Sequence, residues 1–103
     1  MKEFVKVAKV SDLPEGEMMA VEVEGEQVLL VNAGGRFYAL GEVCPHAGAP
    51  LSEGFLEDDS VECPWHASRF KLDTGEVLAP PAETGVPAYA VRVEGDDILV
   101  GPA

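Results

Sequence analysis

The residues of this sequence best suited to chemistry are its two cysteines and two histidines, which lie in two pairs. The first pair is Cys44-Pro45-His46 and the second is Cys63-Pro64-Trp65-His66, with sixteen residues between them. Each pair offers one thiolate and one imidazole from a short segment whose proline restricts the backbone. Soft thiolates and imidazoles suit zinc or iron–sulfur clusters rather than magnesium or calcium. The pattern therefore predicts a metal centre built from two loops.

The order of these ligands separates the two kinds of metal centre. Zinc fingers keep their two thiolates together in a C-x₂₋₄-C knuckle and their histidines together further along the chain. Here a cysteine is followed by a histidine in both pairs. A Rieske-type [2Fe–2S] centre takes both cysteines on one iron and both histidines on the other, so each iron would draw one ligand from each loop. We therefore expect a [2Fe–2S] cluster, with a structural zinc module as an alternative.

The elements that must position these loops are strands. Val21–Glu24 and Tyr89–Val93 alternate with a period of two, which indicates one buried and one wet face. Val28–Val31 and Phe37–Leu40 are short apolar runs bounded by turn residues. Glycine lies in each connecting turn, where a positive φ is expected. Because no stretch of ten residues has a helical period, we expect an all-β fold, a small antiparallel sandwich or barrel.

The strand pattern is interrupted between residues 42 and 82, a segment that holds both cysteines, both histidines and five of the eight prolines. Weaker strands are expected there at Ser60–Glu62 and Arg69–Leu72. We interpret the chain as a single domain, with a β scaffold formed by residues 1–41 and 83–103. A cluster-binding subdomain, residues 42–82, is inserted into that scaffold.

Composition narrows the possible partners. The 103 residues carry a net charge of −12, and seven scattered cations cannot neutralise the phosphates of a nucleic acid. The longest aliphatic run, Val28–Val31, is too short to cross a membrane, and the N-terminus shows no signal-peptide core. We therefore expect a cytoplasmic protein. The acidic surplus serves either solubility alone or an acidic docking surface for a basic partner.

Two segments carry a resemblance to a known family. Cys44-Pro45-His46-Ala47-Gly48 and Cys63-Pro64-Trp65-His66-Ala67-Ser68 resemble the cluster-binding loops of the Rieske family. Leu51–Gly54, Phe70 and Asp73–Gly75 also match that family, and residues 89–97 resemble the closing hairpin of its soluble ferredoxins. The family fold, a small antiparallel β domain with an inserted cluster subdomain, agrees with the organisation described above.

The resemblance implies a role for each matching residue. Cys44 and Cys63 would hold the inner iron, and His46 and His66 would hold the outer iron near the surface. Pro80-Pro81 resemble the proline loop that covers the cluster from a third side. Three further positions surround this centre. Ser68 would either donate a hydrogen bond to a cluster sulfur or satisfy a loop amide, Trp65 would be a lid or a partner contact, and Ala67 replaces the usual glycine.

Departures from the family pattern narrow the type of protein. The inter-loop disulfide of quinol-oxidising Rieske proteins would fall at Ala49 and Trp65, so it cannot form here. Phe70 stands where high-potential relatives have a tyrosine hydroxyl that bonds the cluster. We therefore expect a potential in the lower part of the range of about −150 to +300 mV found for Rieske centres. The negative net charge acts in the same direction.

The function implied by the resemblance is that of a carrier rather than an enzyme. A soluble Rieske ferredoxin would accept electrons from a flavin-containing reductase and deliver them to a terminal oxygenase, and we expect it to be monomeric. The sequence offers no nucleophile–base pair and no phosphate loop that would indicate catalysis. The alternative function is the small electron-transfer subunit of an assimilatory nitrite reductase, which has the same fold.

Overall fold

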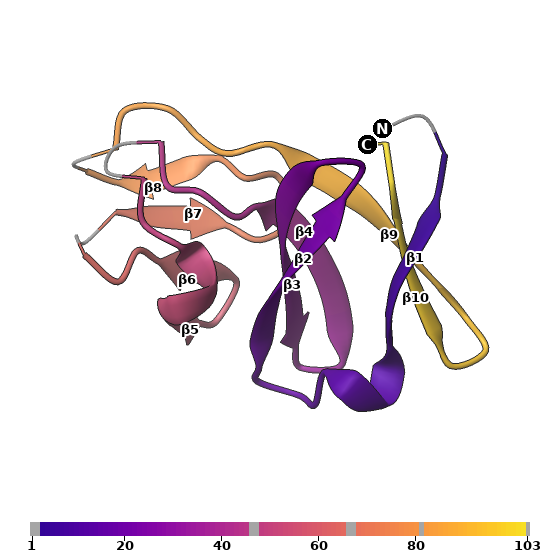
Figure 1. Ribbon diagram of the computed structural model, residues 1–103. Coiled ribbons are helices and arrows are strands. Elements are labelled where there is room, and N and C mark those ends of the chain that lie inside the picture. The colour runs from indigo at the N-terminus through magenta and orange to yellow at the C-terminus, as the bar shows by residue number, and fades with distance from the viewer. Residues whose placement is uncertain (1–2, 46–47, 66–67, 81, 103) are drawn as a thin grey trace.

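The computed structural model describes residues 3–45, 48–65, 68–80 and 82–102, and it shows two antiparallel sheets side by side (Figure 1). The six-stranded sheet has the order β1-β10-β9-β4-β3-β2 and the four-stranded sheet the order β5-β6-β7-β8. The larger sheet is formed by β1 (Val5–Lys9), β2 (Met18–Val23), β3 (Glu26–Ala33), β4 (Arg36–Gly41), β9 (Ala88–Glu94) and β10 (Asp97–Gly101). The all-β antiparallel fold expected from the sequence is confirmed.

The larger sheet curls into a nearly closed barrel. Its two outermost strands, β1 and β2, contact each other, so the sheet leaves little free edge. The two ends of the chain pair in this barrel, where Val5 of β1 lies opposite Val100 of β10. The strands on either side of the inserted region pair there too, since Leu40 of β4 lies opposite Ala88 of β9. The segments before and after the inserted region therefore build one scaffold.

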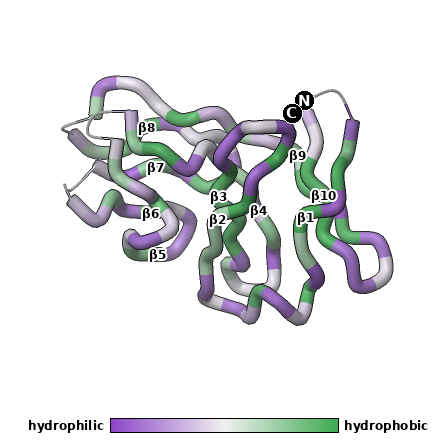
Figure 2. The backbone as a smooth tube through the Cα atoms, in the orientation of Figure 1, coloured by the Kyte–Doolittle hydropathy of each residue, from purple (hydrophilic) through white to green (hydrophobic). Residues whose placement is uncertain are grey.

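Strands β3 and β4 are buried on both faces, which explains their continuous apolar runs. Val28 and Leu30 point into a core inside the barrel, whereas Leu29 and Val31 point into a second core shared with the small sheet. Figure 2 shows hydrophobic positions along the strands of both sheets and hydrophilic residues at many of the turns. The second core is the one that matters for function, because both cysteines lie in it.

The smaller sheet lies between β4 and β9 in the chain. Its strands are β5 (Phe55–Glu57), β6 (Ser60–Glu62), β7 (Arg69–Lys71) and β8 (Val77–Ala79). The middle residues Leu56, Val61 and Phe70 oppose one another across the strands and face the second core. All four strands fall within the predicted inserted segment, while the exact boundaries at residues 42 and 82 stay a prediction.

Glycine is required where the small sheet meets the segment that returns to the barrel. Gly75 has φ +75°, and a Cβ at this position would lie 2.0 Å from the carbonyl oxygen of Val86. The N–H of Val86 donates to the carbonyl of Gly75 over 2.9 Å, so the two backbones are in direct contact. Any side chain at Gly75 would force these backbones apart. The expected glycine turn after Asp73 is therefore confirmed and has a packing reason as well.

The only helical elements in the described part of the chain are the 3₁₀ turns η1 (Val10–Asp12) and η2 (Leu51–Glu53). None of the described helices is long and apolar enough to cross a membrane. Strands β1, β5 and β8 were not expected from the sequence, and β10 was implied only by the hairpin turn expected at residues 94–97. β5 and β8 form the two edges of the small sheet, and β1 is an outermost strand of the larger sheet, so each is recognisable only through its pairing with a neighbouring strand.

Candidate metal centre

The first cysteine sits at the base of a loop that leaves the barrel after β4. Val43 and Pro50 form an isolated antiparallel bridge across the base of this loop. Inside the bridge, the N–H of Cys44 donates to the carbonyl of Ala49 over 2.9 Å, and the N–H of Gly48 donates to the carbonyl of Cys44 over 2.8 Å. Gly48 has φ +71°, a conformation that favours glycine. The turn therefore holds Cys44 firmly at its entrance.

The second cysteine sits at the base of the loop between β6 and β7. The N–H of Cys63 donates to the carbonyl of Ser68 over 2.9 Å, and Ser68 directly precedes β7. The two loops are thus closed in the same way, since each cysteine N–H bonds the carbonyl five residues ahead. Two loops of equal span present one cysteine each from the same position.

Both cysteines are buried in the same core. Cys44 and Cys63 are each 1 % exposed and belong to one cluster of apolar side chains, which includes Phe70 and Leu40. No disulfide joins these two described cysteines. Two soft ligands in a buried, apolar core suit an iron–sulfur centre, because burial limits the access of solvent to the sulfurs.

The remaining predicted ligands, His46 and His66, lie outside the described residues, as do Ala47, Ala67 and Pro81. Within the described ranges, no three His, Cys, Asp or Glu residues gather into a metal-binding group. The assignment of all four ligands therefore stays a prediction. The structure places the two cysteines as that prediction requires, in one core and on two matching loops.

Comparison with known proteins identifies the domain. Residues 3–90 match the family described as the Rieske [2Fe–2S] domain. The chain belongs to the Rieske family. A Rieske domain of this type carries one [2Fe–2S] cluster. The described cysteines fit that cluster, because they supply two buried thiolates, the complete set for its cysteine-ligated iron.

Individual relatives place this Rieske domain among ferredoxins. It is 47 % identical to the 3-phenylpropionate/cinnamic acid dioxygenase ferredoxin subunit of Escherichia coli (strain K12), over 88 % of this chain and 86 % of the relative. The ferredoxin of carbazole 1,9a-dioxygenase from Nocardioides aromaticivorans IC177 superposes with a TM-score of 0.92 at 38 % identity. That superposition covers 99 % of this chain and 100 % of the other.

Two further solved structures bear on partners. The Rieske domain is similar to a chain in the complex of reduced oxygenase and oxidised ferredoxin of carbazole 1,9a-dioxygenase, with a TM-score of 0.90, 30 % identity and coverage of 98 % and 94 %. It is also similar to a putative NADH-dependent nitrite reductase small subunit from Mycobacterium tuberculosis, with a TM-score of 0.88, 29 % identity and coverage of 97 % and 95 %. Both function classes considered from the sequence therefore occur among its structural relatives.

Ser68 connects the second ligand loop to the third loop. Its Oγ accepts the N–H of Ala82 over 2.9 Å, and both residues are buried. Of the two roles considered from the sequence, the loop-amide role is confirmed. The hydroxyl hydrogen is a separate donor, so a bond from Ser68 to a cluster sulfur stays a prediction. Pro80, from the predicted proline loop, is exposed.

The positions that distinguish this chain within the family differ in burial. Phe70 is fully buried in the cysteine core and offers no hydroxyl there. Ala49 is also fully buried, whereas Trp65 is 61 % exposed. An exposed indole next to a ligand loop is accessible to a partner, and both roles considered for Trp65 stay predictions.

Sequence reasoning missed one polar residue in this region. Glu42, between β4 and Cys44, is only 5 % exposed, and its carboxylate accepts hydrogen bonds from Ser52. The available signal was its place between a buried strand and a buried cysteine. That signal is weak in a sequence with nineteen acidic residues.

Proposed function

We propose that this chain is a one-electron carrier that accepts electrons from a flavin-containing reductase and delivers them to a terminal oxygenase. The observation that carries the proposal is the pair of buried, identically closed cysteine loops in a chain related over 88 % of its length to a dioxygenase ferredoxin subunit. When bound, the cluster accepts and releases a single electron. The protein's own task is to hold the cluster, exclude water from it and present it to partners.

The proposed ligands are those expected from the sequence. Cys44 and Cys63 hold the iron on the core side, where both side chains are buried. His46 and His66 hold the other iron. Ser68 holds the second and third loops together, and the third loop includes Pro80 and Pro81. This division supports electron exit through the histidine side, because the cysteine side is covered by the second core.

A docking surface for partners is proposed around the ligand loops. Four large apolar side chains of the described residues are more than half exposed, and three of them lie near the ligand loops in the chain or the small sheet: Val43 before Cys44, Trp65 within the second loop, and Leu78 on β8. The fourth, Phe55, lies on β5 at the other edge of the small sheet. Val77, Leu78, Ala79, Pro80 and Ala82 also line a shallow hollow of about 240 Å³. We propose that the side chains of Val43, Trp65 and Leu78 form one contiguous apolar patch, the surface feature that marks an interaction site. A partner that buries Trp65 would approach the cluster-binding loops.

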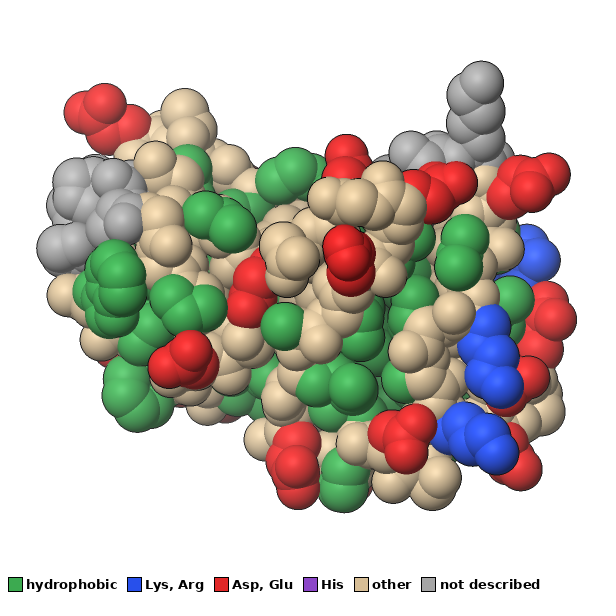
Figure 3. All heavy atoms as spheres, in the orientation of Figure 1, with side chains coloured by type: hydrophobic (Ala, Val, Ile, Leu, Met, Phe, Trp, Pro, Cys, Tyr) green, Lys and Arg blue, Asp and Glu red, His purple; other side chains and the backbone are tan. Residues whose placement is uncertain are grey.

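The charges of the protein bear on how a partner approaches rather than on which face it meets, because Arg69 and Lys71 lie on β7 of the small sheet while Lys6 and Arg92 lie on the barrel. On the face shown in Figure 3, Lys and Arg side chains gather at the end of the molecule opposite the small sheet. Lys6 and Arg92, on β1 and β9 of the barrel, are tied to Asp97 and Glu94, at 3.2 Å and 3.5 Å. The net charge of −12 would steer the protein toward a basic patch on a partner, with association slowed by salt.

The nitrite reductase alternative is supported by the structural similarity to a small subunit from Mycobacterium tuberculosis. The two functions differ in their electron acceptor. Purification of the chain from its own cells together with a large haem-containing protein would favour the nitrite reductase function. Purification as a monomer that reduces a ring-hydroxylating oxygenase would favour the carrier function.

The direct test is anaerobic reconstitution with iron and sulfide, followed by reduction with NADH and a flavin-containing ferredoxin reductase. We expect one reducing electron per chain and re-oxidation by a terminal oxygenase. Cys44→Ser should abolish cluster binding, whereas the exposed variant Glu94→Gln should leave it intact. A colourless protein with one zinc per chain would instead establish the structural zinc module. Cell fractionation would test the expected cytoplasmic location.

A further inference from the structure

Glu42 is a buried carboxylate next to the first cluster loop. It is 5 % exposed, and it follows β4 at the point where the chain leaves the barrel. Its N–H donates to the carbonyl of Gln27 over 3.2 Å, and its carbonyl accepts the N–H of Leu51 over 2.8 Å. Both backbone groups are therefore bonded, and the position of the residue is fixed.

Among the described residues, the side chain of Glu42 accepts its hydrogen bonds from one residue, Ser52. One carboxylate oxygen accepts the N–H of Ser52 over 2.9 Å, and the other accepts the Ser52 hydroxyl over 2.5 Å. An ionised carboxylate is an acceptor on both oxygens, which is the pattern seen here. Ser52 thus stabilises the charged form of Glu42.

No ion pair between described residues involves Glu42. The pairs that occur are Lys6–Asp97, Arg69–Glu57, Lys71–Asp73 and Arg92–Glu94. The charge of Glu42 is therefore balanced by the hydrogen bonds of Ser52 and not by a neighbouring cation within the described ranges. A buried charge without a counter-ion exerts a field on its surroundings that salt screens only weakly.

This charge lies close to the predicted cluster ligand Cys44. Two residues along the chain separate their Cα atoms by about 7 Å at most. Leu51, whose N–H donates to the carbonyl of Glu42, belongs to the same apolar core as Cys44. Reduction adds one electron to the cluster and breaks no bond, so a fixed negative charge nearby makes the reduced form less favourable.

We propose that Glu42, held by Ser52, is a built-in negative charge that lowers the reduction potential of the cluster. The inference rests on the proposed function, because it requires the cluster to be bound by Cys44. It assigns to one buried residue a part of the effect that the sequence suggested for the acidic surplus as a whole. Exposed carboxylates contribute less, because water and salt screen them.

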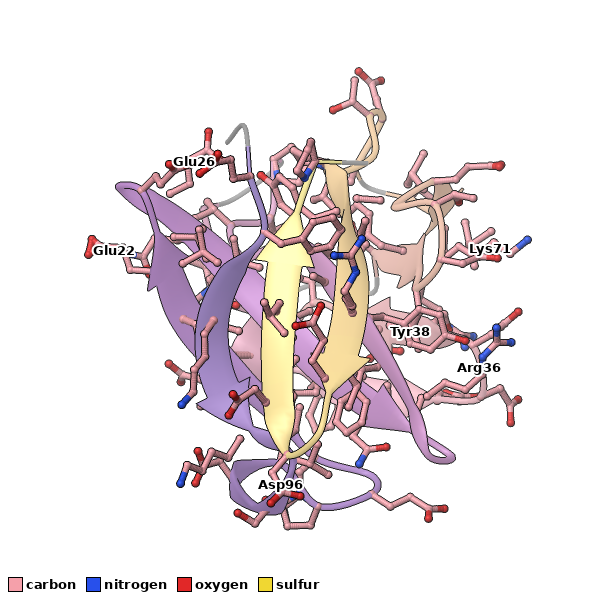
Figure 4. All side chains as sticks on the ribbon, turned by 90° about the vertical axis from the view of Figure 1, so that its right-hand side faces the viewer. Glu22, Glu26, Arg36, Tyr38, Lys71 and Asp96 are labelled. Carbon is pink, nitrogen blue, oxygen red and sulfur yellow. The ribbon has the colours of Figure 1, made fainter. Side chains whose placement is uncertain are left out.

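The test compares two variants that change the net charge equally. Glu42→Gln removes the buried charge and keeps the size and one acceptor oxygen of the side chain. Asp96→Asn removes an exposed charge at the β9–β10 turn (Figure 4), on the barrel end away from the small sheet (Figure 1). Midpoint potentials are measured by protein-film voltammetry on the iron-loaded proteins, at low and high salt.

We expect Glu42→Gln to raise the midpoint potential at both salt concentrations, and Asp96→Asn to leave it unchanged at high salt. The electron paramagnetic resonance spectrum of reduced Glu42→Gln should match the parent, since no ligand is changed. An unshifted potential in Glu42→Gln, or a shift no larger than that of Asp96→Asn, would overturn the inference.

Ser52→Ala gives an independent test if Glu42→Gln does not fold. It removes one of the two hydrogen bonds donated to the Glu42 carboxylate, which disfavours the buried charge, so the midpoint potential should rise toward that of a protein without the charge. A potential that falls or stays the same in Ser52→Ala would contradict the inference. Failure of the proposed function can be told apart from failure of the inference on Glu42, because the parent protein would then show no reducible iron–sulfur cluster at all.

Discussion

The hydroxyl oxygen of Ser68 accepts the backbone N–H of Ala82 over 2.9 Å, and both residues are buried. One side chain therefore ties the loop after Cys63 to the segment that follows the predicted proline loop. The backbone of Ser68 also accepts the N–H of Cys63, so a single residue holds two of the three segments around the predicted cluster.

Ser68→Ala is predicted to destabilise the protein and to lower the cluster potential. The buried N–H of Ala82 would lose its partner, at a cost of about 1–3 kcal/mol. If the hydroxyl also donates to a cluster sulfur, its loss disfavours the reduced form. Thermal unfolding and voltammetry measure the two effects. Ser60→Ala, a buried serine on β6, is the matched control and should change stability without changing the potential.

Phe70→Tyr is predicted to raise the midpoint potential. Phe70 is fully buried in the core that holds both cysteines, so a hydroxyl added there would seek a partner among the cluster sulfurs. Phe37→Tyr adds the same group to the other core and should have no effect on the potential. A parent potential near the top of the Rieske range would refute the low-potential interpretation of Phe70.

The reduction potential is predicted to fall at alkaline pH. The oxidised cluster withdraws more charge from His46 and His66, so their ring protons leave more readily in the oxidised state. Deprotonation therefore stabilises the oxidised form as pH rises. Voltammetry between neutral and strongly alkaline pH measures this slope. A potential that is flat across that range would count against histidine ligation.

The free energy of unfolding is predicted to depend on pH through Tyr89, independently of the cluster. Burial and the neighbouring carboxylate of Glu26 raise the pKa of Tyr89 above its usual value of 10.0. Because the folded state disfavours its ionisation, its contribution to stability is complete below pH 10 and is lost as pH rises through the raised pKa. The free energy of unfolding of Tyr89→Phe, measured in alkaline buffer, should not show this loss of stability. Tyr38→Phe, which keeps Tyr89, should lose stability as the parent protein does.

Much of the fold could be predicted from the sequence because local patterns decide it. The alternation in Val21–Glu24 and the apolar run Val28–Val31 lie within β2–β3, and the glycine turns are where they were expected. The strands β5 and β8 were not predicted, because they form the two edges of the small sheet and no local pattern marks them. Their existence depends on pairing with β6 and β7.

The ligands of the candidate site could be predicted from the sequence, but the residues that support them could not. Cysteine and histidine spacing is a property of the chain, so Cys44 and Cys63 were identifiable from the sequence alone. The Glu42–Ser52 contact joins residues ten apart through side chains. Nothing distinguishes Glu42 from the other eighteen acidic residues until its burial is known.

The central claim is a cluster held by Cys44, His46, Cys63 and His66 that moves single electrons. Pulsed electron paramagnetic resonance on the reduced protein, with ¹⁵N-labelled histidine, tests it most directly. We predict one paramagnetic [2Fe–2S] centre per chain with couplings to two histidine nitrogens, and loss of that centre in both His46→Ser and His66→Ser. A reduced protein without a paramagnetic signal, or a cluster signal without histidine nitrogen couplings, would contradict the claim.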